Sequence, residues 1–368
     1  MLSYIQITAG EPAPWFTLPS AGSPAYAIDT AAGRYLLLCF FGSTSSPHCA
    51  SRLKAVLARQ DLFDDSFAAF FGVSADPRDQ DGRLQNRLPG YRFLWDTDLT
   101  AAKLYGVAPR EPVQTGTGLR SLWALMDPTM RMIATVPFEQ DGSDSQRILG
   151  ILESQPAPDR FAGMRLQAPI LCLPRVFEPD LCESLIATYE ARGGELSGTM
   201  RQVGARTVGI NDLKFKSRRD CDITDQAVIG RIQTAISRRV LPEIRKVHQF
   251  IATRMERYIV SCYDAAEGGH FSPHRDNTTS GTAHRRFAIS INLNSDFDGG
   301  EVSFPEYGPD GLKAPPGGAV VFSCSLLHRV SPVTRGRRYA FLPFVYDDEA
   351  AKLREANKAS IVPSQAQG

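Results

Sequence analysis

The sequence predicts an α/β sheet domain followed by a jelly roll of antiparallel strands supported by helices. In the first part, two continuous apolar runs at 35–41 and 67–77 flank a helical pattern, which is typical of an α/β sheet. A polar, Pro-containing stretch at 153–163 then reads as a connection. Beyond it, helical patterns precede many short strand-like runs, and this order favours a double-sheet barrel supported by helices.

The elements of the first domain follow in order. YLLLCFF at 35–41 has the composition of a strand buried on both faces, and FAAFFGVSADP at 67–77 gives a second such strand. Between them, ASRLKAVLARQDLF at 50–63 has apolar residues at roughly helical spacing. LWALMDP ends in a turn before MRMIATV, so we expect a hairpin there and a first domain spanning 1–155.

The second domain begins with helices and continues with strands. EPDLCESLIATYEARGG predicts a helix with a Gly-Gly stop, and QAVIGRIQTAISRRVLPEIRKV predicts a longer helix interrupted near Pro242. We expect this domain at 164–348 and a frayed tail at 349–368. The expected strands are RYIVSCY, RFAISINLN, EVSFP, GAVVFSC and RYAFLPFVY.

Composition limits the functions to consider. The 368 residues are 43% hydrophobic and 22% charged, as in ordinary globular proteins, and two domains fit this length. A formal net charge of +1 gives no reason to expect nucleic acid or a membrane surface as a partner. With neither a signal peptide nor a membrane span recognisable, a cytoplasmic protein is expected. The seven scattered cysteines predict neither a disulfide framework nor a zinc site.

The stretch GGHFSPHRDN carries the main chemical signal, the pair His274 and Asp276. His328 follows 54 residues later, and this separation is long enough for several strands to bring it beside the first two. Two imidazoles and one carboxylate on one face of an octahedron leave the opposite face open, as non-haem Fe(II) requires. Arg338 comes ten positions further on, and its guanidinium can pair with a dicarboxylate that also chelates the metal.

These residues, together with YDAAEGGHF, DFDGGEVSFPE and PVTRGRR, resemble the Fe(II)- and 2-oxoglutarate-dependent oxygenases of the prolyl 4-hydroxylase type over about residues 165–347. The resemblance implies that His274, Asp276 and His328 ligate iron and that Arg338 holds the distal carboxylate of 2-oxoglutarate. It further implies that Tyr263 lines the co-substrate pocket. The oxygen-sensing members have a tyrosine at the position that Asn292 occupies here. Asn292 is therefore a candidate for contact with the co-substrate.

The implied reaction consumes O2 and 2-oxoglutarate, releases succinate and CO2, and oxidises a C–H bond of a small-molecule or peptidyl substrate. Ascorbate is a further reductant to test. Hydroxylation, desaturation and ring formation are all left open. Upstream, the basic stretch at 201–222 predicts a long loop or β-ribbon, whose Arg206, Lys214, Arg218 and Arg219 either receive an acidic or phosphorylated substrate or form a solvated charged face.

In the first domain, FFGSTSSPHCASRL places Cys49 at the start of a helix, where free amides favour a thiolate, and Arg120 is expected to add positive charge. With GVSADP and DTDLTAAKLYGV, this region resembles a peroxiredoxin of the AhpC/TSA type with a thioredoxin fold, over about 5–153. The resemblance implies that Cys49 is the peroxidatic cysteine and that Ser46 and Arg120 orient the peroxide. Ser46 and Gly42 depart from the threonine and proline usual in that family. Because no resolving cysteine is evident, an external thiol would be the reductant.

The sequence therefore predicts a 2-oxoglutarate-dependent oxygenase with a peroxiredoxin-like N-terminal domain. Two alternatives stay open: a thiol peroxidase whose barrel is a sensor or accessory, and a non-catalytic scaffold. A homodimer is compatible with either.

Overall fold

The computed structural model describes residues 3–82, 84–111 and 118–362. The chain divides into two compact units, one formed by residues up to 167 with 305–309, the other by 168–304 with 310 onward. Each is described by itself. The first unit thus extends past the expected boundary at residue 155.

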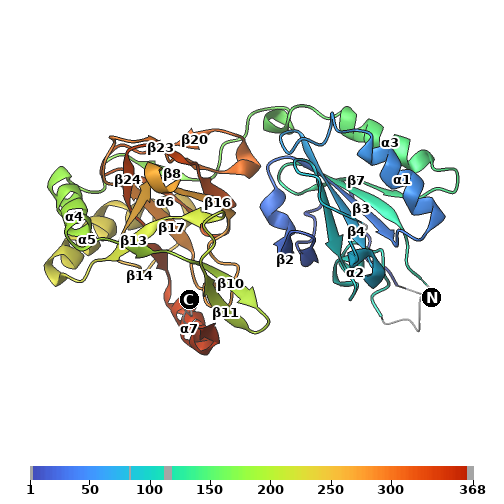
Figure 1. The fold of residues 1–368 in the computed structure, drawn as a ribbon. Helices are drawn as coiled ribbons and strands as arrows, with labels where there is room; N and C mark the ends of the chain where they lie inside the picture. Colours follow the sequence, from blue (N-terminus) through green and yellow to red (C-terminus); the bar gives the residue numbers. More distant parts are fainter. Residues whose placement is uncertain (1–2, 83, 112–117, 363–368) are drawn as a thin grey trace. The chain divides into compact units, whose positions relative to one another are not determined.

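A seven-stranded sheet forms the centre of the first unit (Figure 1). Strands β3, β4 and β5 run parallel, whereas β6 lies antiparallel to β3 and forms the expected hairpin with β7. The thioredoxin-like α/β fold is confirmed. In spatial order the strands are β2 (Ser23–Ala27), β1 (Thr17–Ser20), β5 (Tyr91–Trp95), β4 (Ala68–Ser74), β3 (Tyr35–Gly42), β6 (Leu122–Met126) and β7 (Met132–Pro137).

Helices α1 (Pro47–Leu57) and α3 (Ser143–Glu153) lie side by side against this sheet, and the short α2 (Thr100–Leu104) follows β5 (Figure 1). Alternate residues of a strand point to opposite faces. Accordingly Leu37, Cys39 and Phe41 of β3 pack in one core with apolar residues of α1 and α3.

The second unit is built around a large antiparallel sheet, as the jelly-roll prediction requires. Its path includes β17, β24 and β15 as neighbours, so distant parts of the sequence supply adjacent strands. In spatial order the strands are β14 (Arg254–Glu256), β25 (Phe344–Tyr346), β17 (Phe287–Asn292), β24 (Arg337–Phe341), β15 (Ile259–Asp264), β13 (Arg219–Asp222) and β9 (Glu195–Leu196), with β21 (Ala319–Ser323) pairing β17 and β8 (Leu171–Leu173).

A smaller sheet completes the jelly roll, and its central pair β16 and β22 carries the two histidines predicted as ligands. Its strands are β12 (Lys216–Ser217), β16 (His270–His274), β22 (His328–Val330), β19 (Val302–Ser303) and β20 (Gly311–Leu312). Two minor sheets join β10 (Thr199–Val203), β11 (Arg206–Ile210) and β26 (Ile361–Val362), and β18 (Asp298–Gly299) with β23 (Val333–Arg335).

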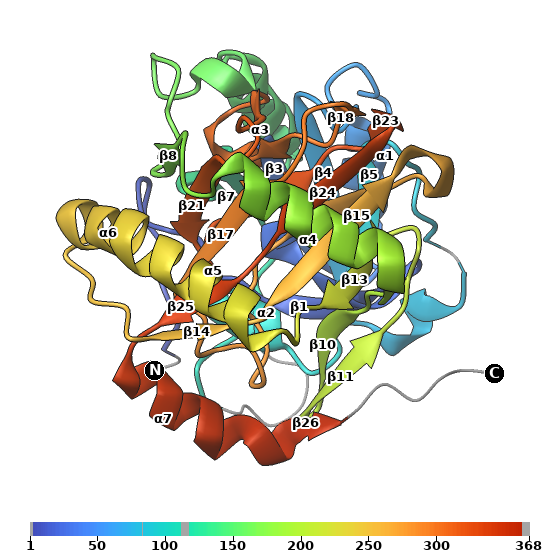
Figure 2. The same ribbon diagram turned by 90° about the vertical axis from the view of Figure 1, so that its left-hand side faces the viewer.

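Helices α4 (Pro179–Arg192), α5 (Gln226–Arg239) and α6 (Leu241–His248) cover the outer face of the large sheet (Figure 2). The break between α5 and α6 falls beside Pro242, as predicted. Because Ile289 and Ile291 of β17 and Tyr339 of β24 pack in the core with these helices, the alternate residues Ser290 and Arg338 face the interior between the sheets.

The expected tail at 349–368 is wrong for its described part. Helix α7 (Asp348–Asn357) is capped by Asp347, whose carboxylate accepts from the Ala350 amide. Beyond this helix, β26 pairs in parallel with β11. An N-cap aspartate followed by good helix formers explains this helix. Residues 363–368 lie outside the described residues.

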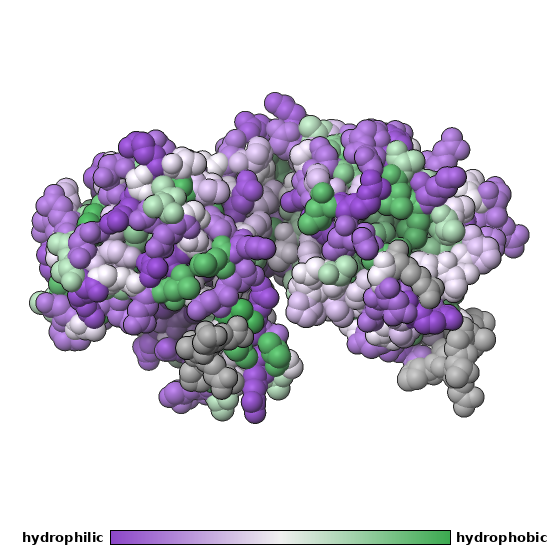
Figure 3. All heavy atoms as spheres, in the orientation of Figure 1, coloured by the Kyte–Doolittle hydropathy of each residue, from purple (hydrophilic) through white to green (hydrophobic). Residues whose placement is uncertain are grey.

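On the face drawn in Figure 3, hydrophilic residues cover most of each unit and apolar residues stand in small groups. Among the described helices, none is both long and apolar enough to span a bilayer. All seven cysteines are free thiols.

Candidate metal centre and co-substrate pocket

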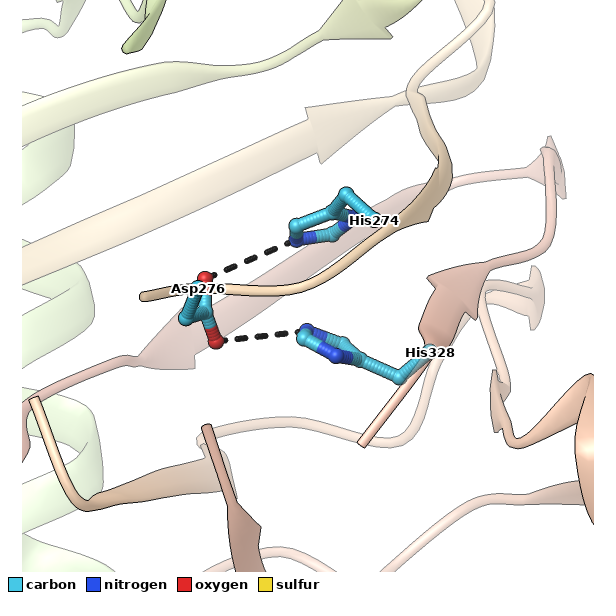
Figure 4. A group of neighbouring side chains, drawn as sticks. All are labelled: His274, Asp276 and His328. Carbon is cyan, nitrogen blue, oxygen red and sulfur yellow. Dashed lines mark ion pairs between the residues drawn. The ribbon is translucent and has the colours of Figure 1, made fainter. Parts of the chain in front are cut away.

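The predicted metal ligands meet at one point between the two sheets of the second unit. His274 ends β16 and His328 begins β22, and these residues face each other across the antiparallel pair. Asp276 follows two residues after His274, and its amide donates to the Cys324 carbonyl at 2.9 Å. The three side chains point toward one another (Figure 4).

Hydrogen bonds orient both imidazoles for metal binding. Nδ1 of His274 lies 2.8 Å from the Ser272 carbonyl, and Nδ1 of His328 lies 3.0 Å from the Leu326 carbonyl. A carbonyl oxygen can only accept, so each Nδ1 carries the proton and each Nε2 keeps a free lone pair. The Nε2 atoms lie 3.6 Å and 3.4 Å from the two oxygens of Asp276.

The electrostatics of His328 and Asp276 suit a divalent cation. Burial, and secondly the neighbouring His274, lower the pKa of His328 to about 4, so this imidazole is neutral near pH 7. Burial raises the pKa of Asp276, but His328 and His274 outweigh this and hold it below its usual value. The ligand atoms all lie within 4.8 Å of one another. Two imidazoles and one carboxylate of this kind fit Fe(II).

Arg338 lies in the same pocket as the three ligands. Its side chain is only 1% exposed, its Nε donates to Asn292 Oδ1 at 2.9 Å, and its Nη2 donates to Ser290 Oγ at 2.9 Å. Nη1 is buried and has no hydrogen-bond partner within the described part of the chain. A buried donor without a partner is rare in native proteins, so this nitrogen fits a carboxylate from a bound ligand.

Tyr263 and Asn292 occupy different places around Arg338. Tyr263 lines the pocket, and its ring centroid lies 5.1 Å from the Arg338 guanidinium carbon. Asn292 is not among the pocket-lining residues; its side chain bridges Arg338 and the Ala314 carbonyl. Its predicted role as a co-substrate contact is therefore replaced by one of orienting Arg338. Ser290, which no sequence motif marked, lines the pocket. It lies two residues before Asn292 in one strand, so the two side chains point to the same face, and this alternation could have identified Ser290 from the sequence.

Of the four basic residues considered in the stretch 201–222, the structure brings one into the pocket. Arg218 is 4% exposed and lines the pocket, whereas Arg206, Lys214 and Arg219 are exposed. The predicted β-ribbon is present as β10 and β11. Arg257, which no sequence motif marked, also lines the pocket.

Cys49 lies in the first turn of α1, as predicted, but its thiol is not activated in this conformation. The residue is 1% exposed and packs in the core of the first unit. Burial and, to a smaller extent, Asp79 outweigh the opposing effect of Arg52 and raise the pKa of Cys49 to about 12. The expected stabilised thiolate is wrong here because the lost hydration outweighs the helix N-terminus.

Of the other two residues of the predicted peroxide site, Ser46 adjoins Cys49, because its carbonyl accepts from the Cys49 amide at 3.0 Å, whereas Arg120 contacts Tyr4. The cation that acts on the thiol is Arg52, which is itself paired with Asp144. The Arg120 guanidinium carbon lies instead 3.5 Å from the centroid of the Tyr4 ring. Ser46 is the N-cap residue of α1, without a side-chain capping bond. Peroxide reduction by Cys49 stays a prediction.

Comparison with known families agrees with both units. Residues 258–346, which contain the metal cluster and Arg338, match the 2OG-Fe(II) oxygenase superfamily, and residues 9–132 match the AhpC/TSA family. The chain thus contains a region similar to the AhpC/TSA family, followed by a region similar to the 2OG-Fe(II) oxygenase superfamily. His274, Asp276 and His328, the residues predicted as metal ligands, form one cluster in or directly beside the strands of this second region.

Relatives of the oxygenase domain include hydroxylases of the PKHD type. One from Synechococcus sp. (strain JA-2-3B'a(2-13)) is 29% identical over 152 residues, which cover 39% of this chain and 65% of the relative. One from Maricaulis maris is 36% identical over 96 residues, covering 25% of this chain and 42% of the relative. The chain therefore spans less than two thirds of the length of these relatives.

Solved structures resemble each domain. A prolyl hydroxylase from Trichoplax adhaerens, in complex with a hypoxia inducible factor peptide, is 14% identical with a TM-score of 0.41 and covers 52% of this chain and 87% of its own. The peroxidoxin BcpB from Mycobacterium tuberculosis is 18% identical with a TM-score of 0.36 and covers 40% of this chain and 98% of its own.

Proposed function

We propose that this protein is an Fe(II)- and 2-oxoglutarate-dependent dioxygenase that oxidises an unactivated C–H bond of a second substrate and releases succinate and CO2. The observation that carries the proposal is the meeting, in one pocket, of a two-histidine, one-carboxylate cluster and a buried guanidinium with an unpartnered nitrogen. The family match of residues 258–346 supports it.

In this proposal His274, Asp276 and His328 would hold the metal. The hydrogen bonds that each imidazole Nδ1–H donates, to the Ser272 and Leu326 carbonyls, fix the ring orientation and would direct Nε2 at the metal. Iron together with 2-oxoglutarate supplies the redox chemistry that couples decarboxylation to C–H oxidation.

Arg338 sets the orientation of the co-substrate. With Nε and Nη2 committed to Asn292 and Ser290, the guanidinium is fixed and Nη1 is the free donor for the distal carboxylate. The pocket around this group contains Ala288, Val302, Phe322 and Val330, and these apolar side chains exclude water from the reacting groups. The protein therefore contributes position and a dry site.

The proposal is tested by O2-dependent conversion of 2-oxoglutarate to succinate by the full chain loaded with Fe(II). Without its second substrate, slow conversion is expected in wild type and none in Asp276→Ala. Asp298→Ala is the matched control, because Asp298 forms a surface ion pair with Arg335. Equal succinate formation by wild type and Asp276→Ala would refute the proposal.

A further inference from the structure

Three arginines line the pocket that contains the metal ligands, and the proposed co-substrate uses one of them. Arg218 lies directly before β13, Tyr263 is on the neighbouring β15, and Arg338 is on β24 beyond it. Arg257 precedes β15. The proposed function assigns a ligand to Arg338 and none to Arg218 or Arg257.

Arg218 has donor capacity that the described residues do not use. Its Nη2 donates to Asp220 Oδ2 at 2.7 Å and its Nη1 to the Tyr263 hydroxyl at 3.3 Å. Its Nε is buried and has no hydrogen-bond partner in 3–82, 84–111 or 118–362. A side chain only 4% exposed rarely leaves such a donor unsatisfied unless a ligand or water fills the place.

One carboxylate serves both of these arginines. Asp220 Oδ2 also accepts from Arg257 Nη2 at 3.0 Å, while Asp220 Oδ1 accepts from Ser261 Oγ at 2.6 Å. Burial and the nearby Arg218 lower the pKa of Arg257 to about 10, which still leaves it charged near pH 7. Arg218, Arg257 and Asp220 together thus carry one excess positive charge. The neighbouring Lys216 donates to Ser197 and Gly198, and burial holds its pKa well below the usual value, so it is left out of this sum.

The metal site supplies nothing to neutralise this excess. A divalent iron, Asp276, the dianion 2-oxoglutarate and Arg338 sum to zero charge. Arg257 is 27% exposed, so solvent screens part of the excess, whereas Arg218 is buried. Among the residues that line the loaded pocket, a further anion beside Arg218 would complete the charge balance.

We infer that Arg218 and Arg257 bind a carboxylate of the substrate that is oxidised, so that the substrate class is small organic acids, free amino acids included. This inference rests on the proposed function and names the substrate class of the same site. A carboxylate carries the single negative charge that the pocket lacks, and its two oxygens suit a guanidinium fork. The Arg218 guanidinium carbon lies 5.7 Å from the Tyr263 ring centroid, so the anion would lie beside the co-substrate pocket.

The test is thermal unfolding of the full chain loaded with redox-inert Mn(II) and 2-oxoglutarate. The probes are acetate, propionate, benzoate and the common free amino acids, each beside its uncharged amide, together with inorganic phosphate. We expect at least one carboxylate to raise the wild-type Tm by about 2–4 °C at about five times its Kd. The corresponding amide should give a much smaller rise.

Variants assign this effect to a residue. Arg218→Met should lose the carboxylate-dependent rise but keep the rise caused by Mn(II) and 2-oxoglutarate. Arg219→Met is the matched control, because its side chain is 44% exposed and pairs with Glu267 at the surface. Arg218→Lys keeps the positive charge and should retain part of the carboxylate-dependent rise in Tm. It replaces Arg218→Met in the test if that variant does not fold.

Four results would overturn the inference: no carboxylate shift in wild type, equal shifts by acids and amides, a shift by phosphate alone, or an unchanged carboxylate shift in Arg218→Met. Loss of the 2-oxoglutarate shift in Arg218→Met would also overturn it, because Arg218 would then serve the co-substrate. If Mn(II) and 2-oxoglutarate themselves gave no shift in wild type, the proposed function would fail instead.

Discussion

Replacing Arg338 by methionine is expected to weaken 2-oxoglutarate binding while leaving metal binding intact. The guanidinium is 1% exposed and is held by Asn292 and Ser290, with Nη1 free for a carboxylate. A charge-assisted hydrogen bond contributes about 1.5–3 kcal/mol, so its loss raises Kd by roughly 10- to 150-fold. Methionine keeps much of the side-chain volume and limits cavity formation.

Isothermal titration of 2-oxoglutarate into the Mn(II)-loaded chain measures this change. Arg337→Met is the matched control from the same strand, because the Arg337 side chain is 52% exposed and bonds Asp264 at the surface. 2-Oxopentanoate, which has a methyl group in place of the distal carboxylate, isolates the contact. Wild type should prefer 2-oxoglutarate strongly, whereas Arg338→Met should bind the two compounds almost equally.

The assignment of Arg338 would be refuted by an unchanged preference for 2-oxoglutarate in Arg338→Met. It would be refuted equally by the same loss of affinity in Arg337→Met, since that would indicate a general effect of charge on this strand.

Two further predictions follow from the pKa values. Because burial raises the pKa of Cys49 to about 12, iodoacetamide at pH 7.5 should alkylate folded Cys49 more slowly than the exposed Cys172, as peptide mass spectrometry can measure; faster labelling of Cys49 would contradict its buried state. Glu256 is buried beside His284 and Arg285; burial raises its pKa, but these partners lower the net value to about 2 from 4.5. Because the pKa of Glu256 is depressed in the folded state, its contribution to the free energy of unfolding is complete above pH 4.5. This contribution, up to about 3 kcal/mol, is lost as the pH falls toward 2. Urea unfolding followed by circular dichroism should show the stability advantage of wild type over Glu256→Gln shrinking over that range, and a constant difference would contradict the assigned pKa.

Local sequence signals were sufficient for the features that one strand or one short motif determines. The apolar run at 35–41 predicted β3 because a strand buried on both faces needs apolar residues at every position. The spacing of His274 and Asp276 predicted that their side chains point at one metal position. His328 was far enough along the chain to return as the third ligand.

Features that depend on three-dimensional packing were not legible in the sequence. Arg218 lies in a polar stretch whose neighbours are exposed, and only the pairing of β13 with β15 directs it into the pocket. The helix N-terminus at Cys49 was visible in the sequence, but the burial that overrides it comes from α3 and the sheet, far along the chain. Asn292 was assigned by position, whereas its role depends on the rotamer of Arg338 across the strands.

The measurement that tests the central claim most directly is the visible absorption of the full chain after anaerobic addition of Fe(II) and 2-oxoglutarate. The account predicts a weak metal-to-ligand charge-transfer band in wild type and in His270→Ala, whose imidazole bonds Gly268 and Lys214 carbonyls outside the cluster, and no band in His274→Ala. A band of equal strength in His274→Ala, or none in wild type, would contradict it.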